Sequence, residues 1–436
     1  MAMRNILTSL LPLLFFVALY VGSGVYFTLQ DVPNAFYQLS PSVAIIPAIM
    51  LAWVLQKNIS NEHRITAFLA GVGHRDIISM CLIFMLAGAF TTVTQSIGSV
   101  DATINMTLSI IPQKFLLIGI FIASALISTA IGTSMGTIAS IAPIASGLAA
   151  QGAFSQALGM ATVIGGAMFG DNLSLVSDTT IAAVSSQEAD YKAKFRINAI
   201  ISCIAGAMTA ILLFLVHNQT VTIEAKEFSP GLILPYAILI GLALSGKNVF
   251  NVLVISIVFA YCIGFLNSGY PFVQFSDDIK TGFMSMNEIM ILSLLVGGLS
   301  GLTSGEAKDI AKKLGNLFPA NSGKTFAQIT IALVVSVMDV LLANNTVAIV
   351  MSGGIAKEVA HRCNIQKHYS AAWLDIFSCV VQGIIPYGAQ ILLASSIAGI
   401  RPLDVVPHVY YCYILGVVAI MFILFCGDKA LRKTSA

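Results

Sequence analysis

Long apolar runs dominate this 436-residue chain and restrict its fold more than any other feature. Residues 6–28, 76–98 and 193–216 are examples, and a helix that crosses a bilayer needs about 20 mostly apolar residues. Charged residues make up only 10% of the chain, against about a quarter in soluble domains, which excludes a soluble enzyme. A transmembrane β-barrel would instead show short alternating segments. The sequence therefore predicts an all-α polytopic membrane protein with about 10–14 membrane segments.

Basic residues between the apolar runs predict the orientation of the chain. Arg4 precedes the first run, and Lys57, Arg64 and Arg75 lie between the second and the third. By the positive-inside rule these segments are cytoplasmic. The same rule applies to the clusters Lys192, Lys194 and Arg196; Lys308, Lys312 and Lys313; Lys357, Arg362 and Lys367; and Lys429, Arg432 and Lys433. Residues 27–40, 218–228 and 268–285 are predicted to be external loops, with both termini cytoplasmic and the protein in the inner, cytoplasmic membrane.

Two parts of the chain show the same order of features. An apolar run ends in Gly132–Thr137, and a second run ends in Ala343–Thr346, with Gly132 and Ala343 separated by 211 residues. The uncharged segment 152–155 after the first break is predicted to be external. Its counterpart, 357–367, is basic and predicted to be cytoplasmic.

Corresponding parts on opposite sides of the membrane indicate two inverted-topology repeats. Secondary transporters are often built this way, with discontinuous or re-entrant helices and a substrate site near the bilayer midplane. The predicted organisation is a first repeat over 1–217, an external linker over 218–228 and an inverted second repeat over 229–436. A chance match of hydropathy between two helix-rich halves is the alternative.

Four aspartates, Asp171, Asp178, Asp339 and Asp375, lie in or beside apolar runs. A charged side chain at the bilayer centre costs roughly 2.5–3.5 kcal/mol on insertion scales. Lys367, near Asp375, is the only Lys or Arg within ten positions of these acids. Each acid therefore needs a distant partner, a bound cation or a proton.

The densest polar cluster, residues 170–180, contains two carboxylates, an amide and four hydroxyls. Oxygen ligands suit hard cations such as Na+, and burial favours the protonated carboxyl group, so that cation and proton can compete for it. We predict that Asp171, Asn172, Ser174, Ser177, Asp178 and Thr179 bind the cation and the proton, with Asp171 and Asp178 as Na+ ligands. The alternative is a polar loop at the end of a span, with Asp178 as a helix cap.

Residues 132–137, 344–346 and 382–390 interrupt apolar runs with glycine, proline or polar side chains. Proline and glycine break helices, and the backbone groups freed in a discontinuous helix can bind an ion or a substrate. The predicted substrate pathway consists of Thr133, Ser134, Thr137, Asp339, Asn344, Asn345, Thr346, Asp375, Ser378, Gln382 and Pro386. Close helix packing, a simple turn or a proline kink without a ligand role are the alternatives.

Three segments resemble the hallmark segments of the NhaC-type Na+/H+ antiporter family, a branch of the ion transporter superfamily. They are Gly132-Thr133-Ser134-x-Gly136-Thr137, Gly170-Asp171-Asn172-x-Ser174-x-x-Ser177-Asp178-Thr179-Thr180 and Ile385-Pro386-Tyr387. The resemblance covers roughly residues 70–427 and implies cation-coupled transport through inverted repeats, with an elevator-like movement. The second half departs from the family pattern, since Ala343-Asn344-Asn345 stands in place of Gly-Asp-Gln and Pro386-Tyr387-Gly388 in place of Pro-Trp-Asn.

The predicted function is secondary active transport, with Na+/H+ antiport by alternating access as the leading hypothesis. The alternatives are a Na+- or H+-coupled transporter of an amino acid or organic acid, and a passive channel or membrane scaffold. No P-loop, GxSxG or HExxH motif supports an enzyme. We expect no cofactor besides the coupling ions Na+ and/or H+ and no nucleic-acid partner. The expected partners are the lipid bilayer and a small cation; a small organic substrate and a homodimer are left open.

Overall fold

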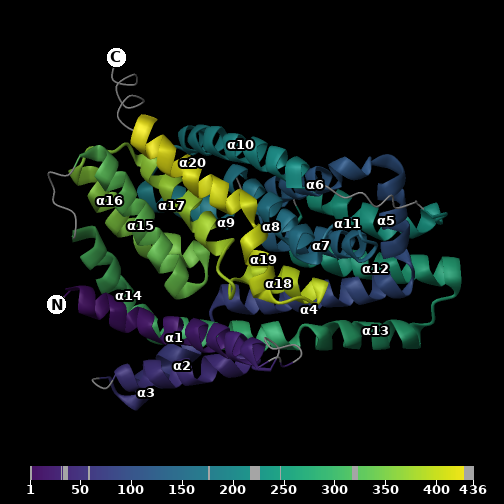
Figure 1. The fold of residues 1–436 in the computed structure, drawn as a ribbon, viewed down its shortest axis with the longest axis horizontal. Coiled ribbons are helices and arrows are strands. Elements are labelled where there is room, and N and C mark those ends of the chain that lie inside the picture. The colour runs from purple at the N-terminus through teal and green to yellow at the C-terminus, as the bar shows by residue number, and fades with distance from the viewer. Residues whose placement is uncertain are drawn as a thin grey trace.

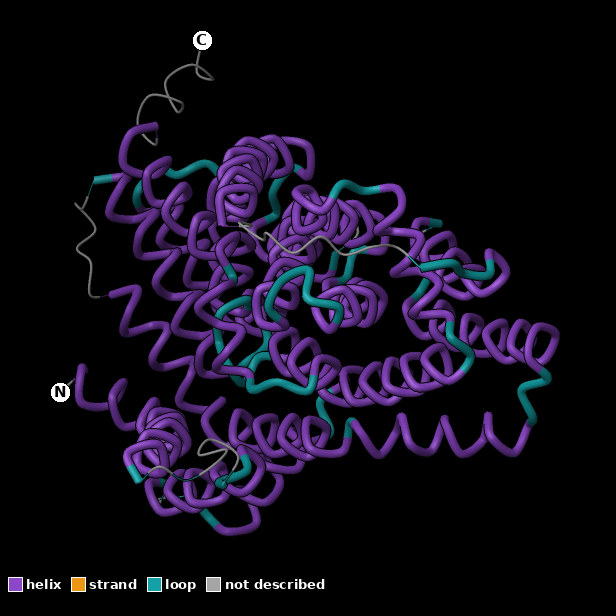
Figure 2. The backbone as a smooth tube through the Cα atoms, turned by 45° about the vertical axis from the view of Figure 1, so that its right-hand side comes forward, coloured by secondary structure: helices purple, strands orange, loops and turns teal. Residues whose placement is uncertain are grey.

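The computed structural model describes residues 2–30, 32, 38–56, 59–174, 177–216, 226–245, 247–316 and 323–426, with the side chains of 2–10, 28, 304–316 and 426 left out. Within these residues all regular structure is helical, as the tube in Figure 2 shows. The predicted all-α class is confirmed. Most of the predicted linker, residues 218–225, and the C-terminal residues 427–436 lie outside the described residues.

Ten α-helices precede the predicted linker and ten follow it among the described residues (Figure 1). The first ten are α1 (Ala2–Leu29), α2 (Pro41–Leu55), α3 (Asn61–Val72), α4 (Arg75–Ser96), α5 (Ser99–Ile110), α6 (Leu116–Ile131), α7 (Ser134–Ala150), α8 (Gln156–Leu173), α9 (Asp178–Gln187) and α10 (Tyr191–Val216). The others are α11 (Leu234–Leu244), α12 (Val249–Ser268), α13 (Phe272–Ser285), α14 (Asn287–Asn316), α15 (Lys324–Leu342), α16 (Asn345–Arg362), α17 (Lys367–Gln382), α18 (Ala389–Ala398), α19 (Pro402–Val405) and α20 (Tyr410–Cys426).

Local sequence signals explain where many of these helices begin and end. Ser60 and Ser155 accept hydrogen bonds from the backbone N–H groups of His63 and Leu158 and so cap α3 and α8. At the other end, Gly269 adopts the left-handed conformation that ends α12. The helix boundaries thus follow from residues that satisfy the free backbone groups of the first and last turns.

Five helices are long and apolar enough to cross a membrane, among the residues described, and the number rises to seven if each of two bent pairs forms one span. The bent pairs are Phe272–Ser285 with Asn287–Thr303, at 42°, and Ala389–Ala398 with Pro402–His408, at 101°. Several of the predicted 10–14 segments correspond instead to shorter apolar helices of 10–17 residues, such as Ser134–Ala150. The breaks in the apolar runs account for these shorter helices.

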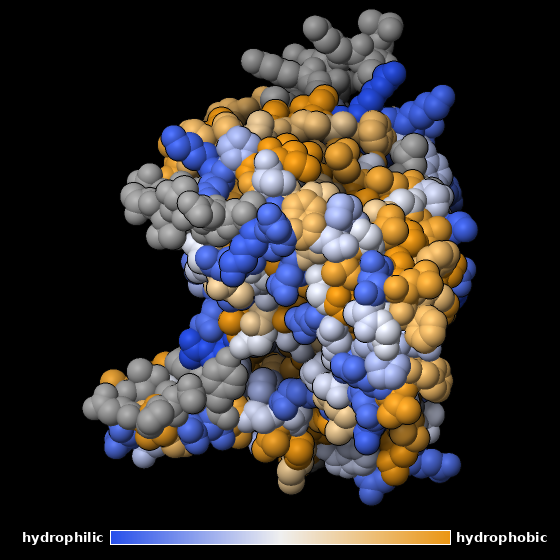
Figure 3. Space-filling model, turned by 90° about the vertical axis from the view of Figure 1, so that its right-hand side faces the viewer, coloured by the Kyte–Doolittle hydropathy of each residue, from blue (hydrophilic) through white to orange (hydrophobic). Residues whose placement is uncertain are grey.

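Large apolar side chains cover much of the outer surface. Leu126 of α6 and Ile211 of α10 are both 62% exposed, and Val350 of α16 and Val417 of α20 are both 60% exposed. Exposed apolar surface on this scale marks contact with a membrane or a partner. Figure 3, which looks onto one end of the molecule, shows hydrophilic side chains among the apolar ones at that end.

Helices α1, α2 and α3 lie together along one edge of the molecule, in both Figure 1 and Figure 2. Helix α3 packs on α14, where Gly71 meets the backbone of Gly297 and Gly301, and α13 packs on α4 through Gly88 and Gly282. The helices α3 and α13 correct the sequence prediction, which took 57–75 and 268–285 as loops. Both helices have polar residues within a short length, so their hydropathy alone did not distinguish them from loops.

Helices α6–α9 and α15–α18 form the part of the fold that contains the predicted breaks. Helix α8 packs against α6 and α7, and α17 packs against α15 and α16. The two short helices cross over, because α9 packs against α16 and α17 of the second half, whereas α18 packs against α7 and α8 of the first. This exchange places the ends of four helices close together in the middle of the fold.

Candidate functional site

Two helix breaks that line the candidate site have nearly the same backbone geometry. Gly132 ends α6 with φ 76° and ψ 22°, and Ala343 ends α15 with φ 50° and ψ 30°. An extended residue follows each of them, Thr133 with φ −147° and Asn344 with φ −150°. The predicted breaks at these two places are confirmed. Glycine adopts the left-handed conformation freely, whereas Ala343 does so at a steric cost.

Two further breaks bring helix ends to the same region. Helix α8 ends at Leu173 before α9 begins at Asp178, and α17 ends at Gln382 before α18 begins at Ala389. The break predicted within 382–390 is therefore confirmed. Ser177 is the residue that caps α9, since its hydroxyl accepts a hydrogen bond from the N–H of Thr180 at 3.2 Å. Asp178 lies in the first turn, where a negative charge is favoured by the helix dipole.

A cavity of about 880 Å³ lies where these helix ends meet. Ten of the predicted site residues line it: Thr133, Ser134, Asp171, Ser177, Asp178, Thr179, Asn344, Asn345, Thr346 and Gln382. Arg75, Asp76 and Lys247 line it as well. The structure thus brings together residues that are more than 200 positions apart in the chain.

Asp171 is the most enclosed acid on the cavity wall, with 4% of its surface exposed. Its carboxylate lies beside Ser134, while its Oδ1 atom has no hydrogen-bond partner among the described residues. Ser134 accepts a hydrogen bond from Gln390 at 3.1 Å, and Gln390 accepts one from Gln382 at 2.9 Å. A chain of neutral polar groups from both halves therefore leads to this carboxylate.

Asp178 also lines the cavity but is exposed. Its neighbours Ser177 and Thr179 are buried and share a hydrogen bond of 3.2 Å between their hydroxyl oxygens. In the part of the chain that the structure describes, no three His, Cys, Asp or Glu side chains come together as a metal-binding group. The cavity wall instead combines the carboxylates of Asp76, Asp171 and Asp178 with hydroxyl and amide oxygens, a mixed oxygen set that suits a hard monovalent cation.

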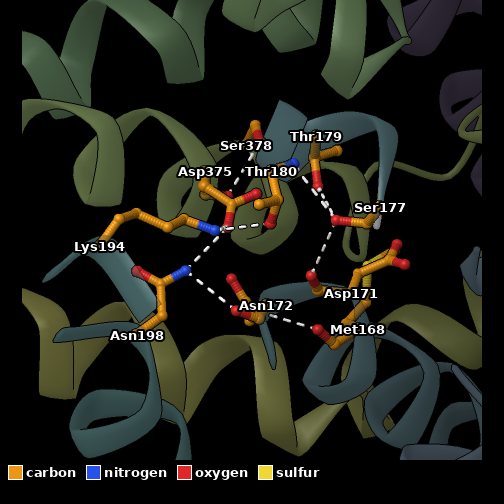
Figure 4. Close-up of polar contacts among 10 residues, drawn as sticks. All are labelled: Met168, Asp171, Asn172, Ser177, Thr179, Thr180, Lys194, Asn198, Asp375 and Ser378. Atoms are coloured by element: carbon orange, nitrogen blue, oxygen red, sulfur yellow. Dashed lines mark hydrogen bonds and ion pairs between the residues drawn. The ribbon is translucent and has the colours of Figure 1, made fainter. Parts of the chain in front are cut away.

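A buried ion pair lies beside the break between α8 and α9. The Nζ atom of Lys194 is 2.5 Å from Oδ2 of Asp375 and donates to Oγ1 of Thr180 at 2.6 Å (Figure 4). Asn198 donates to the same Oδ2 atom at 2.8 Å and to the backbone carbonyl of Asn172 at 3.1 Å. Figure 4 shows the Asp171 carboxylate on the opposite side of the break from Lys194.

Lys194 corrects the charge-based prediction, which assigned it to a cytoplasmic loop. It is 1% exposed and lies near the start of α10. Sequence reasoning missed both Lys194 and Asn198 as partners of the acids. A signal was available in the sequence, because Lys194, Asn198 and Ser202 recur every four residues, which places them on one face of a helix.

Seven predicted residues lie away from the cavity wall. Asp375 belongs to the buried ion pair, Ser378 donates to the backbone carbonyl of Asp375, and the backbone carbonyl of Asn172 accepts the hydrogen bond from Asn198. Asp339 is fully buried, and neither of its carboxylate oxygens has a partner among the described residues. Pro386 lines a separate small cavity of about 20 Å³. The remaining two are Thr137, which bonds to the Thr133 carbonyl at 3.2 Å, and Ser174, which is buried at the end of α8.

Comparison with known proteins adds independent information. The model of the Na+/H+ antiporter family matches residues 6–218 and 220–426. The chain is 23% identical over 383 residues to the Na(+)/H(+) antiporter NhaC of Bacillus subtilis (strain 168), covering 80% of this chain and 83% of that protein. It is 21% identical over 455 residues to the Malate-2H(+)/Na(+)-lactate antiporter of the same organism, covering 94% of each.

A solved structure of MtrF from Neisseria gonorrhoeae, described as illuminating a class of antimetabolite efflux pumps, also aligns with the chain. The alignment covers 96% of this chain and 95% of MtrF, with 12% sequence identity and a TM-score of 0.41. Similarity at this level does not establish a common fold.

Proposed function

We propose that this chain, which belongs to the Na+/H+ antiporter family, exchanges Na+ for H+ across the bilayer by alternating access. Family membership and the apolar helices make it a multi-pass membrane transporter rather than an enzyme. The observation that carries the proposal is Asp171, a buried carboxylate on the cavity wall with one oxygen left without a partner among the described residues. A carboxylate in such a place binds either a cation or a proton.

In this proposal the cation enters the cavity and exchanges with the proton at Asp171. Asp178, exposed on the same wall, attracts the cation, and the hydroxyls of Ser134, Ser177 and Thr179 supply neutral ligands. Cation and proton cannot occupy one carboxylate at the same time. This competition couples the two ions and needs no cofactor.

The cavity opens on the cytoplasmic side in this proposal. Arg75 and Lys247 both line it, and the positive-inside rule places Arg75 on the cytoplasmic side. The structure then corresponds to the inward-facing state of the transport cycle, in the inner membrane and with cytoplasmic termini. A homodimer is part of the same hypothesis.

We also propose that residues 1–217 and 229–436 form two inverted repeats. The matching backbone geometry at Gly132 and Ala343 supports it, as does the reciprocal packing of α9 and α18 on the opposite halves. A two-fold relation between the halves would produce such an exchange. The two matched ranges of the family model meet at residues 218–220, inside the predicted linker.

An organic acid coupled to Na+ or H+ is the second candidate substrate. The cavity of about 880 Å³ falls in the range of sites for small molecules, roughly 300–1,000 Å³, far more than one cation needs. One helix that begins at it, α18, has no side-chain cap at its N-terminus, so its first N–H groups are available to a carboxylate. The malate/lactate antiporter among the relatives agrees with this candidate.

The test is transport by the purified full-length protein in liposomes that contain a pH-sensitive dye. We expect external Na+, but not choline, to make the interior alkaline, because Na+ enters as protons leave. Asp171→Asn keeps the size of the side chain but removes its charge and is expected to slow this exchange at least about tenfold, the order expected for a lost binding group. Asp277→Asn changes an exposed acid of α13 that is not on the cavity wall and is the matched control, with wild-type rates expected.

Full activity of Asp171→Asn would refute the role of this carboxylate. Silence of the wild type with Na+, Li+ and K+ would refute ion exchange itself. Uptake of labelled lactate or malate, driven by a Na+ gradient, would then establish the second candidate.

A further inference from the structure

Helix α10 presents two polar side chains, one turn apart, to a single oxygen of the second half. Oδ2 of Asp375 accepts hydrogen bonds from Lys194 at 2.5 Å and from Asn198 at 2.8 Å. All three residues are at most 1% exposed. Such an arrangement joins α10 to α17 inside the protein, where water does not weaken the interaction.

The same two side chains also hold both ends of the break between α8 and α9. Lys194 bonds to Thr180, in the first turn of α9, and Asn198 bonds to the backbone carbonyl of Asn172, near the end of α8. Helix α10 is thus bonded to one residue on each side of the break, Asn172 on α8 and Thr180 on α9 (Figure 4).

The cavity residues lie directly next to these anchor points. Asp171 precedes Asn172, and the Ser177 hydroxyl, which lines the cavity, donates to the Asp171 carbonyl at 3.2 Å and caps the turn that contains Thr180. A shift of Asn172 or Thr180 must move Asp171 or Ser177. Misplacement of a binding group by about 1 Å costs as much as a hundredfold in rate.

We propose that Lys194, Asn198 and Asp375 form a clamp that positions Asp171 and Ser177 for the cation, with Lys194 as a positioning residue that does not touch the cation. The inference rests on the proposed function, since it assigns the role of the clamp in that exchange. It also gives Asp375 a role as an anchor from the second half, outside the exchange site.

The incomplete hydrogen bonding of the clamp argues against a purely stabilising role. Oδ1 of Asp375, Oδ1 of Asn198 and Oδ1 of Asn172 have no partner among the described residues. A buried polar network that serves stability satisfies all of its groups, and an apolar pair of similar volume is often at least as stable. Compared with an apolar pair, the clamp adds defined positions for Asn172 and Thr180 on the two sides of the break.

The experiment separates positioning from stability with the double variant Lys194→Met/Asp375→Leu, which replaces the ion pair with apolar side chains. Its melting temperature and the Na+ concentration for half-maximal exchange (KM) are measured in the full-length protein beside both single variants. We expect the single variants to unfold at lower temperature and the double variant to recover most of that loss. Its KM for Na+ is expected to remain about tenfold or more above wild type, with a smaller change in maximal rate.

A double variant with both wild-type melting temperature and wild-type KM overturns the clamp. If the double variant fails to fold, Asn198→Leu decides, because it keeps the ion pair and removes the bond to Asn172; an unchanged KM then overturns the proposal. Thr209→Val is the matched control on the same helix, since Thr209 is buried and bonds only to its own helix at Ala205 in the described contacts. If the wild type shows no Na+-dependent proton flux, both the proposed function and the clamp are overturned. If the wild type is active and the clamp variants have the wild-type KM for Na+, the clamp alone is overturned.

Discussion

At the scale of single residues, four acids that lie in or beside apolar runs and look alike in the sequence have four different surroundings. Asp375 is paired with Lys194, Asp171 lies on the cavity wall beside Ser134, and Asp178 is exposed at the start of α9. Asp339 is enclosed, with no partner for its carboxylate among the described residues. A distant lysine is thus the partner of Asp375, whereas Asp171 is the acid to which we assign the proposed exchange.

Asp339 carries the first residue-scale prediction. A buried polar group without a hydrogen bond costs about 1–3 kcal/mol, so Asp339→Leu should raise the free energy of unfolding by about that amount. Because Asp339 lies on the helix that leads into the break at Ala343, we expect exchange to fall at the same time, as is typical when a functional group opposes stability. Thermal unfolding and liposome transport measure the two effects.

Ser352→Ala is the control for this prediction. It also removes a buried hydroxyl that lacks a partner among the described residues, but it changes no charge. Exchange should continue at the wild-type rate in this variant. A fully active Asp339→Leu protein would show that the acid has no part in transport.

At the scale of elements, the helix breaks are the features that build the cavity. Two of the four breaks begin with a left-handed residue, Gly132 after α6 and Ala343 after α15, and in both an extended residue and a new helix N-terminus follow. The positive ends of α7 and α16 therefore meet the cavity wall. Non-helical backbone inside a membrane protein is tolerated where it is enclosed by protein and lines a cavity.

The two left-handed positions give a reciprocal prediction. Gly132→Ala places a Cβ atom in a conformation that disfavours it and should cost about 1 kcal/mol, whereas Ala343→Gly relieves the same strain and should stabilise by a similar amount. The free energies of unfolding of the two variants should thus change in opposite directions. Equal destabilisation by both variants would contradict the geometry of the second break.

At the scale of the whole molecule, contacts between the two halves hold the short helices in place. Helix α9 packs on α16 and α17, and Glu188, just after α9, pairs with Lys357 at 2.6 Å and with Lys367 at 3.2 Å. Helix α18 makes the corresponding exchange with α7 and α8. Each half therefore completes the cavity wall of the other.

The surface ion pairs of Glu188 predict that this residue does not affect how the exchange rate depends on pH. The two lysine ammonium groups hold the pKa of the Glu188 carboxyl below its usual value. Pairing therefore persists at and above the ordinary glutamate pKa and is lost only as the pH falls through the lowered value. Between about pH 6 and pH 9 the residue stays ionised, and Glu188→Gln should leave the shape of the pH profile of exchange unchanged.

The profile is measured beside Glu358→Gln, which removes an exposed acid whose partner, Arg362, lies on the same helix. Neither variant should move the midpoint of the profile. A shifted midpoint in Glu188→Gln alone would show that the contact between the halves takes part in pH sensing.

The sequence by itself determined the membrane class, the order of the apolar segments and the places where helices break. These properties are local, because apolar runs, glycine, proline and capping residues act on their own neighbourhood in the chain. The cluster around Asp171 and the polar residues after Gly132 and Ala343 were therefore visible before the structure, and most of them line the cavity.

Only the tertiary structure decided which acid has a partner. Lys194 and Asp375 are 181 residues apart, and nothing local distinguishes this lysine from the basic residues of a cytoplasmic loop. The same holds for Asp339 and Pro386, whose distance from the cavity depends on how α15, α17 and α18 pack. Packing determines which long-range pairs of charges meet and how much water reaches them, and hydropathy along the chain carries no information on either.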